Sequence, residues 1–185
     1  MAQRAFRNFY WGFLFVMIDF RINGFDILPD LIGYAFFVAG LNLLLERNNH
    51  FSQARTFNII MLILSIFSIY ERPAENTGGF NIHIDFIGLL TGIAALIFSL
   101  LAMYHLFMGI KQLAEEYDAS DISAESEQRW KQFLYLQLAG FGVFLLILLP
   151  PLALVYLIVM LVISIALTVK FMGFMTRCGN RFSEI

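Results

Sequence analysis

The sequence predicts an all-α integral membrane bundle of six transmembrane helices, arranged as three helical hairpins. Three observations predict it: the composition, one very long uncharged stretch, and the placement of Lys and Arg. Hydrophobic residues make up 59% of the 185-residue chain and charged residues 14%, whereas charged residues make up about 25% of a typical soluble domain. A soluble globule of this length could not bury so much apolar surface. Residues 1–185 are therefore expected to form a single transmembrane domain in a lipid bilayer.

Apolar runs mark the expected helices, because a helix that spans a bilayer needs about 20 mostly apolar residues. The 38 residues from 132 to 169 carry no charge. As one helix they would be about 57 Å long, nearly twice the hydrocarbon thickness of about 30 Å. Pro150 and Pro151 lie in the middle, and proline breaks a helix, so we expect two helices here. The six helices are predicted near 6–20, 27–45, 56–70, 82–110, 130–149 and 151–174.

Lys and Arg indicate the orientation. With the N-terminus inside, ten of the twelve basic residues lie on the inner side and only Arg21 and Arg72 on the outer side. Cytoplasmic segments of membrane proteins carry an excess of Lys and Arg. The sequence therefore predicts a multi-pass protein of a bacterial cytoplasmic membrane, with both termini in the cytoplasm.

Residues 111–129 form the one sizeable polar segment between apolar runs. Six of these residues are acidic, and Ser123 is a candidate N-cap for the next helix. We expect a solvated acidic cytoplasmic loop. A docking element for a partner protein is the alternative.

A short repeat links two of the predicted hairpins. Residues 24–33 (GFDILPDLIG) align without gaps on residues 79–88 (GFNIHIDFIG) at an offset of 55, and six of the ten positions are identical. Two predicted helices separate the copies, so both copies run in the same direction across the membrane. The first two hairpins are therefore predicted to be a parallel internal repeat, as some transporters contain.

Each copy of the repeat lies where an outer loop enters a helix. Asp26 and Asn81 are expected N-caps, which accept a hydrogen bond from a free backbone N–H. Asp30 and Asp85 follow four residues later on the same helix face. They either stabilise the helix ends through the helix dipole or mark a binding site, since ionisable groups at membrane depth are costly.

Glycines share the face of these carboxylates. Gly88 and Gly92 make a G-x-x-x-G spacing, which lets helices approach closely. Because a face that packs closely against another helix points inward, we expect the carboxylates to point towards the bundle interior. The expected helix-packing residues are Gly33, Gly40, Gly88 and Gly92.

The outer side of the predicted bundle is acidic, and an acidic vestibule concentrates cations. An acid followed by Arg ends the first and third apolar runs, which suggests an ion pair in each hairpin. His83 lies near Asp85 and could bind a metal or respond to pH, or could simply be hydrogen-bonded. The expected ligand-binding residues are Asp26, Asp30, Asp85, His83, Asn81, Arg21, Glu71 and Arg72.

Polar residues deeper in the apolar runs are few. They are expected to hydrogen-bond between helices or to the carbonyl four residues back, and His105 is assigned no role. The set comprises Asn42, Asn58, Ser65, Ser68, Thr91, Ser99, His105 and Gln137.

Several functions are excluded or not expected. A single Cys excludes a disulfide scaffold, and a net charge of −2 without a basic patch excludes a nucleic-acid partner. The chain has no G-x-S-x-G, H-E-x-x-H, P-loop or Cys-pair motif. We expect no enzyme activity, no cofactor and no metal site.

The segment FDILPDLIGY, residues 25–34, resembles a motif of small multi-span membrane proteins of Gram-positive bacteria. In size and topology the chain is also similar to the substrate-capture subunits of energy-coupling-factor vitamin transporters. Those subunits carry an Ala-x-x-x-Ala-like seam in the first helix, whereas residues 9–14 here read FYWGFL.

Function is predicted at the level of class. We expect a polytopic membrane protein that binds or transports a small molecule or cation through an outward-facing acidic vestibule. The alternative is a non-transport accessory protein, a sensor or assembly partner of another membrane complex. Expected partners are the bilayer, a small ligand, and a second membrane protein or another copy of the chain.

Overall fold

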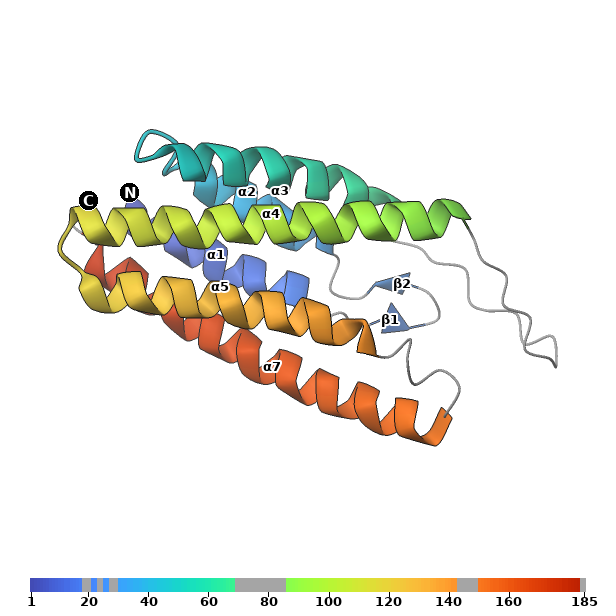
Figure 1. The fold of residues 1–185 in the computed structure, drawn as a ribbon. Helices are drawn as coiled ribbons and strands as arrows, with labels where there is room; N and C mark the ends of the chain where they lie inside the picture. Colours follow the sequence, from blue (N-terminus) through green and yellow to red (C-terminus); the bar gives the residue numbers. More distant parts are fainter. Residues whose placement is uncertain (18–20, 23–24, 27–29, 69–85, 143–149, 184–185) are drawn as a thin grey trace.

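The computed structural model is a bundle of antiparallel helices (Figure 1). It describes residues 1–17, 21–22, 25–26, 30–68, 86–142 and 150–183. The all-α class is confirmed: β structure in these ranges is limited to β1 (Arg21–Ile22) and β2 (Phe25–Asp26), which pair antiparallel. The helices are α1 (Ala2–Met17), α2 (Asp30–Asn42), α3 (Asn49–Ser68), α4 (Phe86–Glu116), α5 (Ser120–Gly140) and α7 (Pro150–Arg181).

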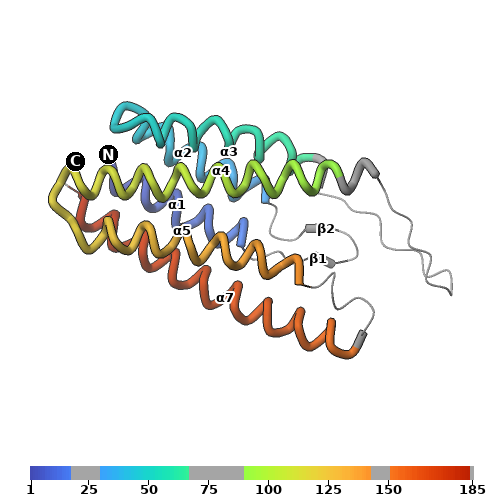
Figure 2. Tube along the Cα trace, in the orientation of Figure 1, coloured from blue at the N-terminus to red at the C-terminus, as the bar shows by residue number. Residues whose placement is uncertain are grey.

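Successive helices run up and down the bundle. Both termini, the α2–α3 turn and the α4–α5 turn lie at one end, on the left in Figures 1 and 2, which we call the terminal end. The strand pair lies toward the opposite end, which we call the strand end. Each helix packs against the next, α1 also packs along α7, and contact between α5 and α7 is sparse. The helices therefore form a ring that is weakest between α5 and α7.

The α5 helix ends at Gly140, whereas the predicted helix runs to 149, and the other large differences from the predicted bounds lie at the terminal end. There α3 and α5 begin earlier than predicted, and α4 and α7 end later. The apolar runs used for the prediction end at the first polar residues, whereas the backbone hydrogen bonds of a helix continue through those polar residues. The predicted break in the long uncharged stretch is present, since α7 begins at Pro150, in the first turn where proline is tolerated.

The expected acidic loop at 111–129 is wrong, because most of it is helical. Only residues 117–119 separate α4 from α5. Asp118 has a left-handed backbone (φ 52°), which Asp tolerates better than most residues. Ser123 is not the N-cap: Ala119 holds that position without a side-chain cap, and the Ser123 hydroxyl donates to Glu115 Oε1 at 3.1 Å.

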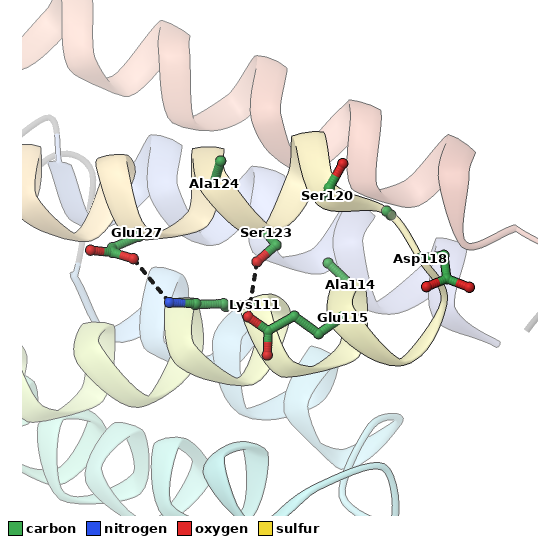
Figure 3. A pocket seen from close by; sticks show the side chains of 9 residues that line it. Lys111, Ala114, Glu115, Asp118, Ser120, Ser123, Ala124 and Glu127 are labelled. Atoms are coloured by element: carbon green, nitrogen blue, oxygen red, sulfur yellow. Dashed lines mark hydrogen bonds and ion pairs between the residues drawn. The ribbon is translucent and has the colours of Figure 1, made fainter.

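Two acidic side chains of this segment, Glu125 and Glu127, pair with basic ones. Figure 3 shows the hollow between α4 and α5, a cavity of about 560 Å³ where Lys111 donates to Glu127 at 2.9 Å. Lys131 donates to the same carboxylate at 2.8 Å. These two hydrogen bonds lower the pKa of Glu127 to about 2. The segment is therefore a charged clasp between neighbouring helices.

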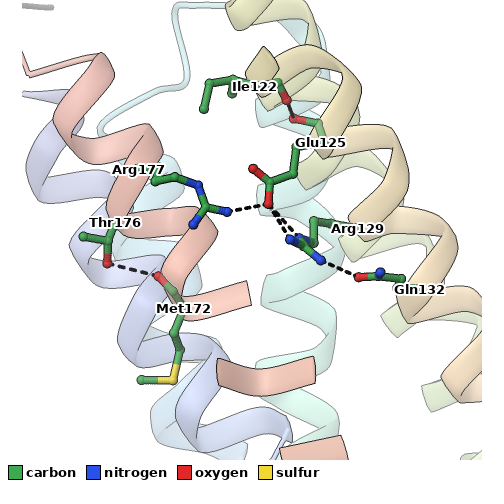
Figure 4. A network of polar contacts seen from close by, with 8 residues as sticks. Ile122, Glu125, Arg129, Gln132, Met172, Thr176 and Arg177 are labelled. Atoms are coloured by element: carbon green, nitrogen blue, oxygen red, sulfur yellow. Dashed lines mark hydrogen bonds and ion pairs between the residues drawn. The ribbon is translucent and has the colours of Figure 1, made fainter. Parts of the chain in front are cut away.

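A second ion pair bridges the sparse contact between α5 and α7. The Glu125 carboxylate accepts from both Arg129, on its own helix, and Arg177, on α7 (Figure 4). Its side chain is 19% exposed, so the charges are only partly hydrated. This network closes the ring at the terminal end.

Phenylalanine rings fill the middle of the bundle. The Phe13 ring on α1 lies 5.0 Å from that of Phe37 on α2, 5.2 Å from Phe171 on α7 and 5.9 Å from Phe107 on α4, centroid to centroid. All four side chains are fully buried. We call these four residues the phenylalanine cluster.

Two of the four expected packing glycines lie at the interface of α1 and α2. A Cβ at Gly33 would lie 2.5 Å from Val16 Cγ2, and one at Gly40 would lie 2.8 Å from the Ala5 carbonyl oxygen. The expectation for Gly92 is wrong within this chain, because a Cβ there would meet nothing within 4 Å among the described residues. Gly88 lies in α4.

Two helices are long and apolar enough to cross a membrane, by length and composition: Leu90–Glu116 and Pro151–Arg181. In their most apolar windows 39% of the residues are buried in the first and 6% in the second. A core helix of a soluble protein is mostly buried, and α7 is not. Its outward side chains include Leu154, Val162 and Val169, each more than half exposed.

Gly40→Ala is expected to destabilise the bundle. The new methyl would meet the Ala5 carbonyl oxygen, a backbone atom that cannot rotate away, and overpacking costs about 1–3 kcal/mol. Gly92→Ala is the matched control, because that helical position is open and Ala is favoured over Gly in a helix by about 1 kcal/mol. Thermal unfolding in detergent should show a lower Tm for the first variant and an equal or higher Tm for the second. Equal losses would contradict the close approach of α1 and α2.

Candidate functional site

The structure describes part of the predicted ligand-binding set. Arg21 and Asp26 face each other in the β1–β2 register, and Asp30 is the first residue of α2. The remaining predicted site residues lie outside the described ranges; they are Glu71, Arg72, Asn81, His83 and Asp85.

Asp26 is not the N-cap of α2, because it belongs to β2 and the helix begins at Asp30. Asp30 therefore lies in the first turn and not one turn deeper. A carboxylate in the first turn is stabilised by the helix dipole, so the helix-end role foreseen for Asp30 agrees with its position. The same residue also lines a cavity.

This cavity, which we call the Asp30 cavity, has a volume of about 360 Å³. Every one of the six described helices contributes to its wall. The lining residues are Val16 and Met17 of α1, Asp30 and Tyr34 of α2, Met61 of α3, Ala95, Leu96 and Ser99 of α4, Phe133, Leu136 and Gln137 of α5, and Ser164 of α7. Small-molecule sites are typically concave, mostly apolar and set with a few polar groups, which describes this wall.

Asp30 and Tyr34 supply the acidic side of the wall. They are four residues apart on α2 and therefore on one helix face. Tyr34 is buried, with 3% of its surface exposed. A carboxylate next to a phenol offers an anionic acceptor and a neutral hydroxyl group within one turn.

Two hydroxyl groups and one amide are the other polar side-chain groups of the wall. Ser164 donates to the Met17 carbonyl oxygen at 2.9 Å and so satisfies the end of α1. Ser99 donates to the Leu96 carbonyl oxygen at 3.0 Å. Both hydroxyl oxygens keep lone pairs that can accept from a ligand. In the described part of the chain, the Gln137 amide has no hydrogen-bond partner, so its donors and its acceptor remain available to a ligand.

The phenylalanine cluster lies directly on the terminal side of the cavity. Along α2, Tyr34 is followed one turn later by Phe37, and along α1, Met17 is preceded one turn earlier by Phe13. The four buried rings lie one turn or more beyond the lining residues and are not part of the cavity wall.

The sequence pattern indicated some of these residues and not others. Asp30 was predicted as a site residue, and Ser99 and Gln137 only as buried polar groups. Tyr34 was detectable from its i+4 spacing to Asp30. Ser164 carried no signal, because the chain separates it from Met17 by 147 positions.

A histidine pair was also missed. His50 Nδ1 of α3 and His105 Nδ1 of α4 are 2.9 Å apart, and the His105 ring stacks on Phe57 at 5.6 Å. The pair ties the two helices together near the start of α3. Within the described ranges, no three His, Cys, Asp or Glu side chains gather where they could hold a metal ion.

Comparison of the chain with protein-family models, curated proteins and solved structures finds no match. The two resemblances drawn from the sequence therefore stay predictions.

Phe13→Ala is expected to be among the most damaging single substitutions. It removes a ring that contacts three other helices, and truncating a buried Phe costs about 3–5 kcal/mol. Tyr135→Ala removes a ring that is 65% exposed, and its effect should stay within about 0.5 kcal/mol. The measurement is thermal unfolding of both variants in detergent. Similar effects of the two variants would show that the phenylalanine cluster does not hold the bundle together.

Proposed function

We propose that this chain is a multi-pass integral membrane protein whose Asp30 cavity binds a small organic cation. The exposure of apolar side chains on α7 supports the proposal of a membrane protein. An apolar helix with 6% of its most apolar window buried would present its side chains to water in a soluble monomer, whereas hydrocarbon is the environment that such a surface favours.

The proposed topology has six spans in three hairpins. The up-and-down order of the described helices supports it, as does the common end of the termini and the two turns. The starts of the second helices of the first two hairpins support a parallel repeat. Helix α2 begins at Asp30 and α4 begins at Phe86, which is one residue past the position that the offset of 55 makes equivalent to Asp30.

The terminal end is proposed to face the cytoplasm. Of the basic residues in the described ranges, Arg21 lies toward the strand end, Arg129 and Lys131 lie near the middle of α5, and the others belong to the terminal-end parts of their helices or to the α2–α3 turn. Excess positive charge is retained on the cytoplasmic side during insertion. The Asp30 cavity then lies toward the outer leaflet.

Cysteine labelling tests this topology. Cys178 is buried and can be replaced by Ser to remove the background. Thr77→Cys, in the predicted outer loop, is expected to react with a membrane-impermeant maleimide in intact cells. Asn180→Cys, exposed at the terminal end, is expected to react only after the membrane is permeabilised. The reverse pattern, or equal labelling of both, would contradict the proposed orientation.

The wall of the Asp30 cavity carries the ligand proposal. Asp30 is the one acidic residue of that wall, and no basic residue lines it. A carboxylate therefore selects for positive charge, while Met61, Leu96 and Leu136 offer an apolar surface to a carbon skeleton. A small amine or quaternary ammonium fits both features.

A non-transport accessory protein, a sensor or assembly partner, is the alternative proposal. It rests on the absence of deep charges or an obvious path in the last two predicted helices, together with the acidic segment 111–129, most of which is helical. Glu125 and Glu127 in it are engaged in ion pairs.

Ligand binding is tested with choline and putrescine as probes, and with dimethylbutanol as the uncharged isostere of choline. The purified protein in detergent is expected to bind at least one of the two cations and not the isostere. Asp30→Asn should weaken that binding at least about tenfold, equivalent to about 1.4 kcal/mol. Asp121→Asn, which removes an exposed carboxylate at the terminal end, should leave it unchanged.

Isothermal titration gives the affinities, and thermal unfolding shows whether each variant is folded. Equal binding by wild type and Asp30→Asn would contradict the site. Binding of neither cation by the folded wild type would contradict the class of ligand.

A further inference from the structure

A second recess lies at the terminal end, between the first half of α1 and the last two turns of α7. Its volume is about 480 Å³. The polar and aromatic residues of its wall are Gln3, Arg4, Phe6, Arg7, Tyr10 and Trp11 of α1 and Thr176 and Asn180 of α7. We call it the Arg4–Arg7 groove.

The Arg4–Arg7 groove carries two positive charges that no acidic residue of its two helices neutralises. Arg4 and Arg7 are three residues apart, hence on one face of α1, and both are exposed. Neither α1 nor α7 contains an acidic residue. The ion pairs of the described chain engage other cations, namely Lys111, Arg129, Lys131 and Arg177. The two guanidinium groups are therefore available to an anion.

Guanidinium chemistry favours one kind of anion. Its planar fork of N–H donors matches the oxygens of a phosphate or carboxylate. The Thr176 hydroxyl already donates to the Met172 carbonyl oxygen at 3.1 Å, and its oxygen can still accept. The Asn180 amide on the same wall can donate as well as accept. The groove can therefore hold a phosphate together with a hydroxylated group attached to it.

The surroundings distinguish a lipid phosphate from a free one. The Trp11 ring is 42% exposed and packs edge-on against Tyr10 at 5.5 Å. Amphipathic rings of this kind gather at the membrane–water interface. From Thr176, the same face of α7 continues with Val169 and Ile165, which are 64% and 43% exposed. A polar recess thus opens onto an apolar strip that an acyl chain can follow.

We propose that the Arg4–Arg7 groove binds the headgroup of an anionic phospholipid of the inner leaflet. Arg4 and Arg7 contact the phosphate, and the acyl chain lies along Val169 and Ile165. Basic pockets between helices on the cytoplasmic side are suited to anionic headgroups. The inference rests on the membrane placement proposed above and is independent of the ligand of the Asp30 cavity.

Native mass spectrometry of the detergent-purified protein tests this, with phosphatidylglycerol and phosphatidylcholine titrated separately. Wild type is expected to bind phosphatidylglycerol in preference. Arg4→Gln with Arg7→Gln should weaken that binding by about 30-fold, or about 2 kcal/mol at 1.4 kcal/mol per tenfold. The double Lys variant at these two positions, which keeps the charge, should retain most of the binding.

Arg47→Gln with Arg55→Gln is the matched control, because it removes two charges at the same end outside the groove. It should leave the preference for phosphatidylglycerol unchanged. Undiminished binding by the Arg4/Arg7 Gln variant, or an equal loss in the control, would overturn the proposal. Displacement of the lipid by inorganic phosphate at equal concentration would assign the groove to free phosphate and also overturn it.

Membrane fractionation separates this outcome from a failure of the membrane proposal. A chain that sediments with membranes but shows no preference for phosphatidylglycerol refutes the lipid site alone. A chain found in the soluble fraction refutes the membrane placement, and the lipid site with it.

Discussion

The contact of the Phe13 ring with the rings of Phe37, Phe107 and Phe171 is the interaction on which the bundle depends. These residues belong to four helices, and α1 is the one that places a ring among the other three. Phe13 and Phe37 meet at the α1–α2 interface, where Gly33 and Gly40 let the two helices approach. Aromatic pairs add a geometric preference to the burial of large apolar area. The cluster therefore sets the distances between helices.

The bundle separates two polar environments across this aromatic layer. At the terminal end, Glu125 and Glu127 are each held between two cations and link α5 to its neighbours. On the strand side, the polar groups that line the cavity are few and one of them is acidic. A few polar groups in a mostly apolar wall can fix the orientation of a small ligand. This asymmetry explains why one end serves as a structural clasp and the other as a candidate binding site.

Helix α7 connects these features, because it contributes to the Asp30 cavity, to the phenylalanine cluster and to the Arg4–Arg7 groove. Ser164, Phe171 and Thr176 do so in turn along its length. Its outward face is apolar and exposed, and its contact with α5 is sparse. The position of α7 is therefore determined mainly by α1 and by the Glu125–Arg177 ion pair.

The sequence by itself determined the helical class, the break at Pro150, and Asp30 as a residue of interest, because composition, proline and local spacing act over a few residues. It placed the helix ends poorly at the terminal end, since apolar runs end where polar side chains begin while helical hydrogen bonds continue. Tertiary structure alone decided that Asp30, Gln137 and Ser164 line one cavity, that Gly92 faces open space, and that the acidic segment is a clasp. Those outcomes depend on which helix faces meet, and packing between residues far apart in the chain leaves no local pattern to read.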